Sequence, residues 1–207
     1  MTREFHTFGN GRVDVYPFEY KDYKELLRIC LVKRDKSKKE SHNYYRWYRN
    51  YVMIVLGTNV GARIETLLQL TPKHIEGGYA KIKEFKTNKT QKFKINKDVL
   101  KIINDYIDDN YITEHEYLFK TYRNTQKPLT RQQAYNVIEE LSKEVGIKYS
   151  VGCHSLRKSF GRFIYDKKHD IYVVQRLLGH SSAKITEQYI CVKDETIEQI
   201  REDSCFL

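Results

Sequence analysis

The stretch "HSLRKSF", from His154 to Phe160, combines two cationic side chains with an apolar helical pattern. On an α-helix, residues three positions apart share one face, so the imidazole of His154 and the guanidinium of Arg157 would point together. Leu156 and Phe160 would then face the protein interior. Two cationic hydrogen-bond donors on one helical face favour an anion as their ligand.

Composition indicates a basic protein with a negatively charged partner. The chain has 207 residues, and 37 Lys and Arg exceed 27 Asp and Glu to give a formal net charge of +10. This excess favours a polyanion, first of all nucleic acid, over an acidic small molecule. The sequence contains no run of about 18 apolar residues, and its polar start does not resemble a signal peptide. We therefore expect a cytoplasmic protein with no membrane partner.

Apolar residues at helical spacing surround the opening stretch on both sides. In the segment 44–70 they are interrupted by "GTNVGA", which predicts two helices meeting at a Gly-rich bend. Thr130 is a candidate N-cap and Gly146 a candidate stop for another helix. The remaining predicted helices cover residues 20–32, 98–110, 153–167, 170–180 and 184–192.

The hydrophobic period changes to two in only one region. Residues 79–85 ("YAKIKEF") and 91–95 ("QKFKI") alternate lysine with apolar residues, and "KTNKT" between them is typical of a turn. This pattern predicts a small antiparallel sheet with one lysine-lined face exposed to water. The predicted fold class is therefore mostly α with a small antiparallel β-sheet (α+β).

Several enzyme signatures are absent from the sequence. "FGNGRVD" has Asp14 where a dinucleotide-binding loop needs its last glycine, and "HEYLF" has Phe119 where a zinc protease needs its second histidine. No G-K-[ST] loop occurs. The four cysteines are far apart, with no C-x-x-C pair, so they suggest neither a zinc site nor a disulfide framework. These are Cys30, Cys153, Cys191 and Cys205.

Four segments, in order, resemble the conserved boxes of the tyrosine recombinase (phage integrase) family. They are "GARIETLLQLTPKHI", "EFKTNKTQKFKI", "HSLRKSFGRFIY" and "LLGHSSAKITEQYI", and the resemblance covers roughly residues 45 to 195. The spacing also agrees, because H-x-x-R precedes L-L-G-H-[ST] by about two dozen residues and Tyr189 follows His180 by nine. The resemblance implies the tyrosine recombinase catalytic-domain fold.

The chemistry of DNA cleavage suits these residues. Without a metal, the charge that develops on the two non-bridging oxygens of a phosphodiester needs strong donors, and we assign Arg63 and Arg157 to that task. Tyr189 is the expected nucleophile, forming a phosphotyrosyl ester. His154 and His180 would assist with hydrogen bonds and proton transfer. Each of these residues also has a purely structural interpretation, as a surface arginine, a helix cap or a packed tyrosine.

The family implies that a lysine in the turn between two strands protonates the leaving 5′ oxygen. Lys86 occupies that place in "FKTNK", with Lys89 as the second choice. The other nearby lysines would contact the phosphate backbone of DNA. These are Lys81, Lys83, Lys92 and Lys94.

The sequence departs from the family pattern in three ways. Glu65 lies two positions after Arg63, where the family often has an acid at three, and Lys158 stands where histidine is common. The third departure is the short N-terminal part, which leaves a naturally minimal recombinase and an excised catalytic domain as alternatives. We predict an N-terminal arm and first helix at 1–45, a catalytic core at 46–190 and a C-terminal tail at 191–207. This tail would dock on a neighbouring protomer or fold back on its own domain.

The predicted function is site-specific DNA recombination through a 3′-phosphotyrosyl intermediate, by integration, excision or inversion. The resemblance implies double-stranded DNA as partner, self-association as a tetramer on two DNA sites, and a bacterial or phage-encoded, nucleoid-associated protein. An accessory DNA-bending protein is a further candidate partner, and no metal or nucleotide cofactor is expected. Two alternatives stay open: type IB topoisomerase-like relaxation, and a non-catalytic DNA-binding regulator of the same fold.

Overall fold

The computed structural model of the protein describes residues 14–83, 90–122 and 127–191. The chain divides into two compact units, Met1–Phe160 and Gly161–Leu207. The described part of the first unit contains helices α1 (Tyr20–Asp35), α2 (His42–Val60), α3 (Ile64–Leu68), α4 (Lys97–Asp109) and α5 (Arg131–Val145), and the short 3-10 helix η1 (Pro72–His74). Helix α6 (Cys153–Lys168) begins in the first unit and ends in the second, which also carries α7 (Ile171–Leu178) and α8 (Ala183–Ile190).

A three-stranded antiparallel sheet completes the first unit. Its order is β1 (Ile75–Glu76), β2 (Tyr79–Lys83) and β3 (Thr90–Lys94). Ala80 pairs with Phe93 on one face, and Lys81 pairs with Lys92 on the other. Ala80 is buried whereas Lys81 and Lys92 are exposed, as the period-two pattern predicts. The predicted fold class, mostly α with a small antiparallel sheet, is confirmed.

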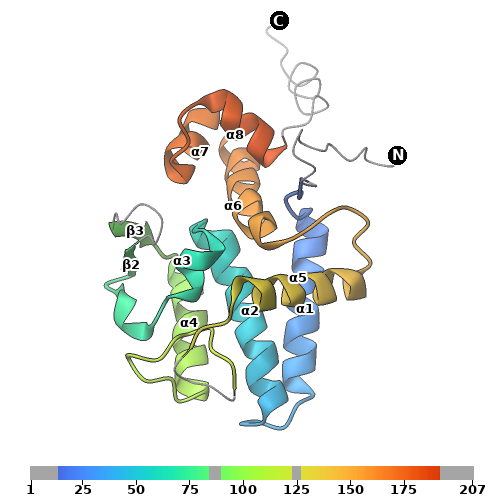
Figure 1. The fold of residues 1–207 in the computed structure, drawn as a ribbon, viewed down its shortest axis with the longest axis vertical. Coiled ribbons are helices and arrows are strands. Elements are labelled where there is room, and N and C mark those ends of the chain that lie inside the picture. Colours follow the sequence, from blue (N-terminus) through green and yellow to red (C-terminus); the bar gives the residue numbers. More distant parts are fainter. Residues whose placement is uncertain (1–13, 84–89, 123–126, 192–207) are drawn as a thin grey trace, which may run out of the picture. The chain divides into compact units, whose positions relative to one another are not determined.

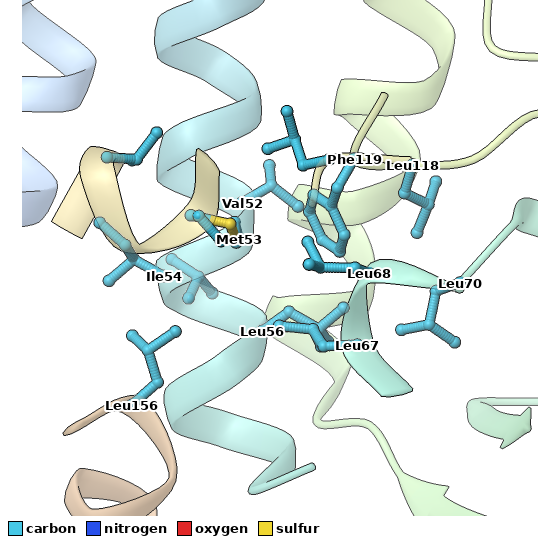
Figure 2. Packing of buried hydrophobic residues seen from close by; sticks show 14 of the residues in the cluster. Val52, Met53, Ile54, Leu56, Leu67, Leu68, Leu70, Leu118, Phe119 and Leu156 are labelled. Carbon is cyan, nitrogen blue, oxygen red and sulfur yellow. The ribbon is translucent and has the colours of Figure 1, made fainter. Parts of the chain in front are cut away.

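The core of the first unit is built around α2. Helices α1 and α2 lie side by side and α5 crosses them (Figure 1). Figure 2 shows Val52 of α2 beside Phe119, and Leu56 of α2 beside Leu67 of α3. Leu156 reaches the same core from the start of α6. The opening stretch of α6 is therefore anchored through its apolar side chains, which leaves its polar ones to other contacts.

Two glycines, one within α2 and one at its C-terminal cap, allow α6 to approach closely. A Cβ on Gly57 would lie 2.8 Å from Cδ1 of Leu156, and one on Gly61 would overlap the ring of Phe160. Gly61 also has a φ of +67° and ends α2 as its left-handed cap. The predicted bend in "GTNVGA" therefore occurs at Gly61 alone. Gly57 lies within the helix, where its lack of a side chain allows close packing and does not produce a turn.

Replacing Gly61 with alanine should destabilise the first unit. The left-handed backbone costs an L-residue about 1–2 kcal/mol, and overpacking against Phe160 adds about 1–3 kcal/mol. Urea unfolding followed by fluorescence of Trp47, the one tryptophan of the sequence, measures the change. Gly146→Ala is the matched control, because Gly146 has a φ of +79° but nothing within 4 Å of its Cβ position. Equal losses in the two variants would contradict the packing role of Gly61.

Candidate functional site

The turn that ends α2 places Arg63 at the start of the next helix. Gly61 caps α2, and Arg63 is the N-cap of α3 with its carbonyl accepting the amide of Leu67 at 2.9 Å. Arg63 is partly exposed. A short helix that follows a glycine turn fixes the backbone of this arginine.

Arg157 meets the same turn from α6. Its side chain is 6% exposed, and its guanidinium donates a hydrogen bond to the carbonyl oxygen of Gly61. A guanidinium carries five N–H groups in a fixed fork, so this bond orients the whole group. Arg157 is therefore bonded to the turn that leads into Arg63, which lies 94 positions earlier in the sequence.

His154 lies one turn before Arg157 and is exposed. Its pKa is lowered, first by partial desolvation and next by the positive charge of Arg131, while Glu65 acts in the opposite direction. A lowered pKa favours the neutral imidazole, which can accept as well as donate a proton.

The sequence analysis did not identify Arg131, a cation that lies beside the predicted residues. It begins α5, and Cys153 Sγ at the start of α6 contacts its carbonyl oxygen at 3.6 Å. Glu65 forms an ion pair with Arg131 at 3.4 Å, so this acid has a described partner other than Arg63. The sequence did contain a signal for Arg131. An arginine at a helix N-terminus interacts unfavourably with the helix dipole, so its presence there indicates another role.

The second unit brings His180 and Tyr189 together. Gly179 ends α7 in the left-handed conformation, and Gln175 of α7 donates to the carbonyl oxygen of His180 at 3.1 Å. The rings of His180 and Tyr189 meet edge to face with centroids 4.9 Å apart. The turn after α7 therefore holds the histidine against the partly exposed tyrosine of α8.

A hydrogen-bond chain favours one tautomer of His180. Its Nδ1 lies 3.1 Å from Oγ1 of Thr186, which donates to the carbonyl oxygen of Ser182 at 3.1 Å. The hydroxyl has a single hydrogen and the carbonyl can only accept, so the simplest assignment has Nδ1–H donating to Thr186. In the neutral ring this leaves Nε2 as the proton acceptor.

The backbone that follows Tyr189 is fixed from α6. Arg162 donates to the carbonyl oxygen of Cys191 at 2.8 Å, and Cys191 has a φ of +52°. Tyr172 on α7, another tyrosine of this unit, is 68% exposed and lies outside the core.

Some predicted residues lie outside the described part of the chain. Lys86 and Lys89 belong to the segment 84–89, and most of the tail at 191–207 is likewise not described. Their roles stay predictions, as do those of the arginines, histidines and tyrosine above and the domain boundaries. Among the residues described here, no group of three or more His, Cys, Asp or Glu side chains could hold a metal ion. No described helix is long and apolar enough to cross a membrane.

Comparison with known families places this chain among recombinases. The phage integrase family model matches residues 21–196. A probable integrase/recombinase, YoeC of Bacillus subtilis (strain 168), is 37% identical over 149 residues, which cover 72% of this chain and 80% of YoeC. The tyrosine recombinase XerD of Staphylococcus saprophyticus is 28% identical, and the match covers 74% of this chain but 53% of XerD. The chain thus spans about half the length of the XerD relatives.

Solved structures agree in fold. The crystal structure of XerA recombinase has a TM-score of 0.72 at 21% identity, covering 92% of this chain and 65% of XerA. A XerH site-specific recombinase, solved in a post-cleavage complex with a palindromic difH substrate, has a TM-score of 0.67 at 22% identity and covers 90% of this chain and 52% of XerH. These likenesses show a shared fold.

Proposed function

Because this chain belongs to the phage integrase family of tyrosine recombinases, we propose that it cuts and rejoins DNA strands at specific sites through a 3′-phosphotyrosyl intermediate. The observation that carries the proposal is the hydrogen bond from Arg157 to the Gly61 turn that leads into Arg63, with His154 on the same helix as Arg157. The net charge of +10 and the DNA complex of XerH support duplex DNA as the substrate.

The first unit would hold the scissile phosphate. Arg63 and Arg157 would donate to the two non-bridging oxygens, whose negative charge grows in the transition state. His154 adds a donor of adjustable protonation, and Arg131 adds positive potential nearby. Since Arg157 is already oriented by Gly61, little reorganisation would be needed when the phosphate binds.

The second unit would supply the nucleophile. The phenol oxygen of Tyr189 would attack phosphorus, forming the Tyr–O–P bond while the bond from phosphorus to the 5′ oxygen breaks. Nε2 of His180 could accept the phenol proton, and Lys86 is our prediction for the acid that protonates the leaving 5′ oxygen. Attack by the 5′ hydroxyl of a partner strand reverses these steps and completes the exchange.

Recombination also requires several protomers on two DNA sites. We propose a tetramer of this chain, with the tail at 191–207 linking neighbours, on duplex DNA from a mobile or switchable element. The exchange would produce integration, excision or inversion. These assignments rest on the family and not on the structure, since this tail lies almost wholly outside the described residues.

A suicide substrate tests the proposal. A nicked duplex built from the DNA that flanks the gene should trap the wild-type protein as an adduct resistant to SDS. Paired sites on a plasmid and a labelled linear duplex should then yield recombinant product. Relaxation of a supercoiled plasmid without recombinant product would favour the topoisomerase alternative, and bound DNA without any adduct would favour the non-catalytic regulator.

A further inference from the structure

A short N-terminal segment lies along the start of α6. We call residues 14–18 the strap. The amide of Tyr16 donates to the carbonyl oxygen of Ser150 at 2.9 Å, and the amide of Phe18 donates to Oγ of Ser159 at 2.7 Å. Phe18 is 2% exposed and Ser159 is fully buried. The strap is therefore packed against the helix that carries His154 and Arg157, rather than lying loosely on the surface.

An ion pair joins the strap to the residue that follows Arg157. Nζ of Lys158 lies 2.8 Å from Oδ1 of Asp14, and Lys158 is 4% exposed. A buried ammonium is costly without a nearby negative charge. Asp14 supplies that charge, so α6 can keep Lys158 inside the protein.

Contacts on different faces fix the rotation of α6. Arg157 bonds Gly61 of α2, whereas Lys158 and Ser159 meet the strap. Successive residues of a helix are about 100° apart around its axis. Holding residue 157 on one side and residues 158 and 159 on the other therefore prevents the helix from turning about its axis. Such a turn would move the Arg157 guanidinium away from the Gly61 carbonyl.

From this geometry we propose that the strap positions Arg157, with Asp14 as the positioning residue for the phosphate site, because its carboxylate keeps the Lys158 ammonium inside the protein. Without the Asp14 carboxylate, the start of α6 would rotate or loosen so that the Lys158 ammonium reaches water. Arg157 would be displaced with it. The predicted effect on cleavage rests on the proposed function, whereas the predicted effect on the position of α6 does not.

The test compares Asp14→Asn with a matched variant, Asp105→Asn. Both remove one negative charge, but Asp105 pairs with Lys101 on the surface of α4. At saturating suicide duplex, Asp14→Asn should form the covalent adduct at least about 10-fold more slowly, since misplacing a preorganised donor weakens transition-state stabilisation. Asp105→Asn should react at the wild-type rate. Removing a negative charge should leave DNA affinity equal or higher, which is opposite in sign to the effect on cleavage.

Lys158→Met separates positioning from a direct role of the lysine. Methionine needs no charged partner, and Asp14 is partly exposed and can be hydrated. Both Lys158→Met and the double variant Asp14→Asn/Lys158→Met should therefore retain at least about a third of the wild-type rate, because neither contains a buried ammonium that has lost the Asp14 carboxylate. If Lys158→Met reacts as slowly as Asp14→Asn or slower, the positioning role is overturned.

Hydrogen exchange without DNA gives a readout independent of catalysis. The amides of residues 155–160 should exchange faster in Asp14→Asn than in Asp105→Asn and the wild type, and the double variant should restore protection. Faster exchange in a protein whose wild type forms no adduct would support the strap while contradicting the proposed function. Wild-type exchange at 155–160 together with a wild-type cleavage rate in Asp14→Asn would overturn the inference.

Discussion

Replacing Tyr189 with phenylalanine should abolish covalent attachment of the protein to DNA. The change removes only the phenol oxygen, so the ring can keep its edge-to-face contact with His180. Without that oxygen no Tyr–O–P bond can form, and losing a nucleophile lowers a rate by about 10,000-fold or more. The measurement is the yield of SDS-resistant adduct on the suicide duplex, beside the wild type.

Two other tyrosines provide matched controls for this result. Tyr165 lies within α6 and Tyr172 is exposed on α7, so each can lose its hydroxyl without loss of core packing. Both Tyr165→Phe and Tyr172→Phe should form adduct at nearly the wild-type rate. Tyr189→Phe should still bind the duplex in a gel shift, because the positive charges that contact phosphates remain. An adduct that persists in Tyr189→Phe would move the nucleophile to another residue.

Local signals predicted most of the fold. Thr130 and Gly146 cap the two ends of α5 as predicted. The Thr130 side chain accepts a hydrogen bond from the amide of Gln133, and Gly146 adopts the left-handed conformation. These features depend on neighbours in sequence, and the capping rules describe such neighbours well. The two strands around residues 84–89 were predictable for the same reason, since alternation of lysine with Ala, Ile and Phe has a period of two.

Contacts distant in sequence were not predictable in this way. The pattern "GTNVGA" suggests a bend at both glycines, but only the packing of Leu156 explains why Gly57 lies within a helix. Likewise, nothing near Lys158 in the sequence points to Asp14, 144 residues away. The candidate site shares this limit: its motifs are recognisable one by one, whereas the Arg157–Gly61 bond and the Glu65–Arg131 pair depend on tertiary structure.

Replacing Arg157 with lysine should nearly eliminate cleavage although the charge is kept. Lysine has one nitrogen where arginine has a rigid fork, so it cannot both bond the Gly61 carbonyl and donate to a phosphate oxygen in the same geometry. Removing one preorganised donor to a developing anion costs about 100- to 1,000-fold in rate. Single-turnover adduct formation at saturating DNA measures this loss. Arg28→Lys is the control, because Arg28 forms an exposed pair with Glu25 on α1, and this variant should cleave as the wild type does.

A neutral substrate then tests what Arg157 does for the reaction. In a methylphosphonate at the scissile position, a methyl group replaces one non-bridging oxygen, so the negative charge that the arginine would neutralise is gone. The defect of Arg157→Ala should therefore shrink to about 10-fold or less on this substrate, because less negative charge is present in the transition state for the arginine to stabilise. An equally large defect on both substrates would mean that Arg157 holds the fold through Gly61 and does not act on the phosphate. Urea unfolding of Arg157→Ala, followed by Trp47 fluorescence, would then show a matching loss of stability.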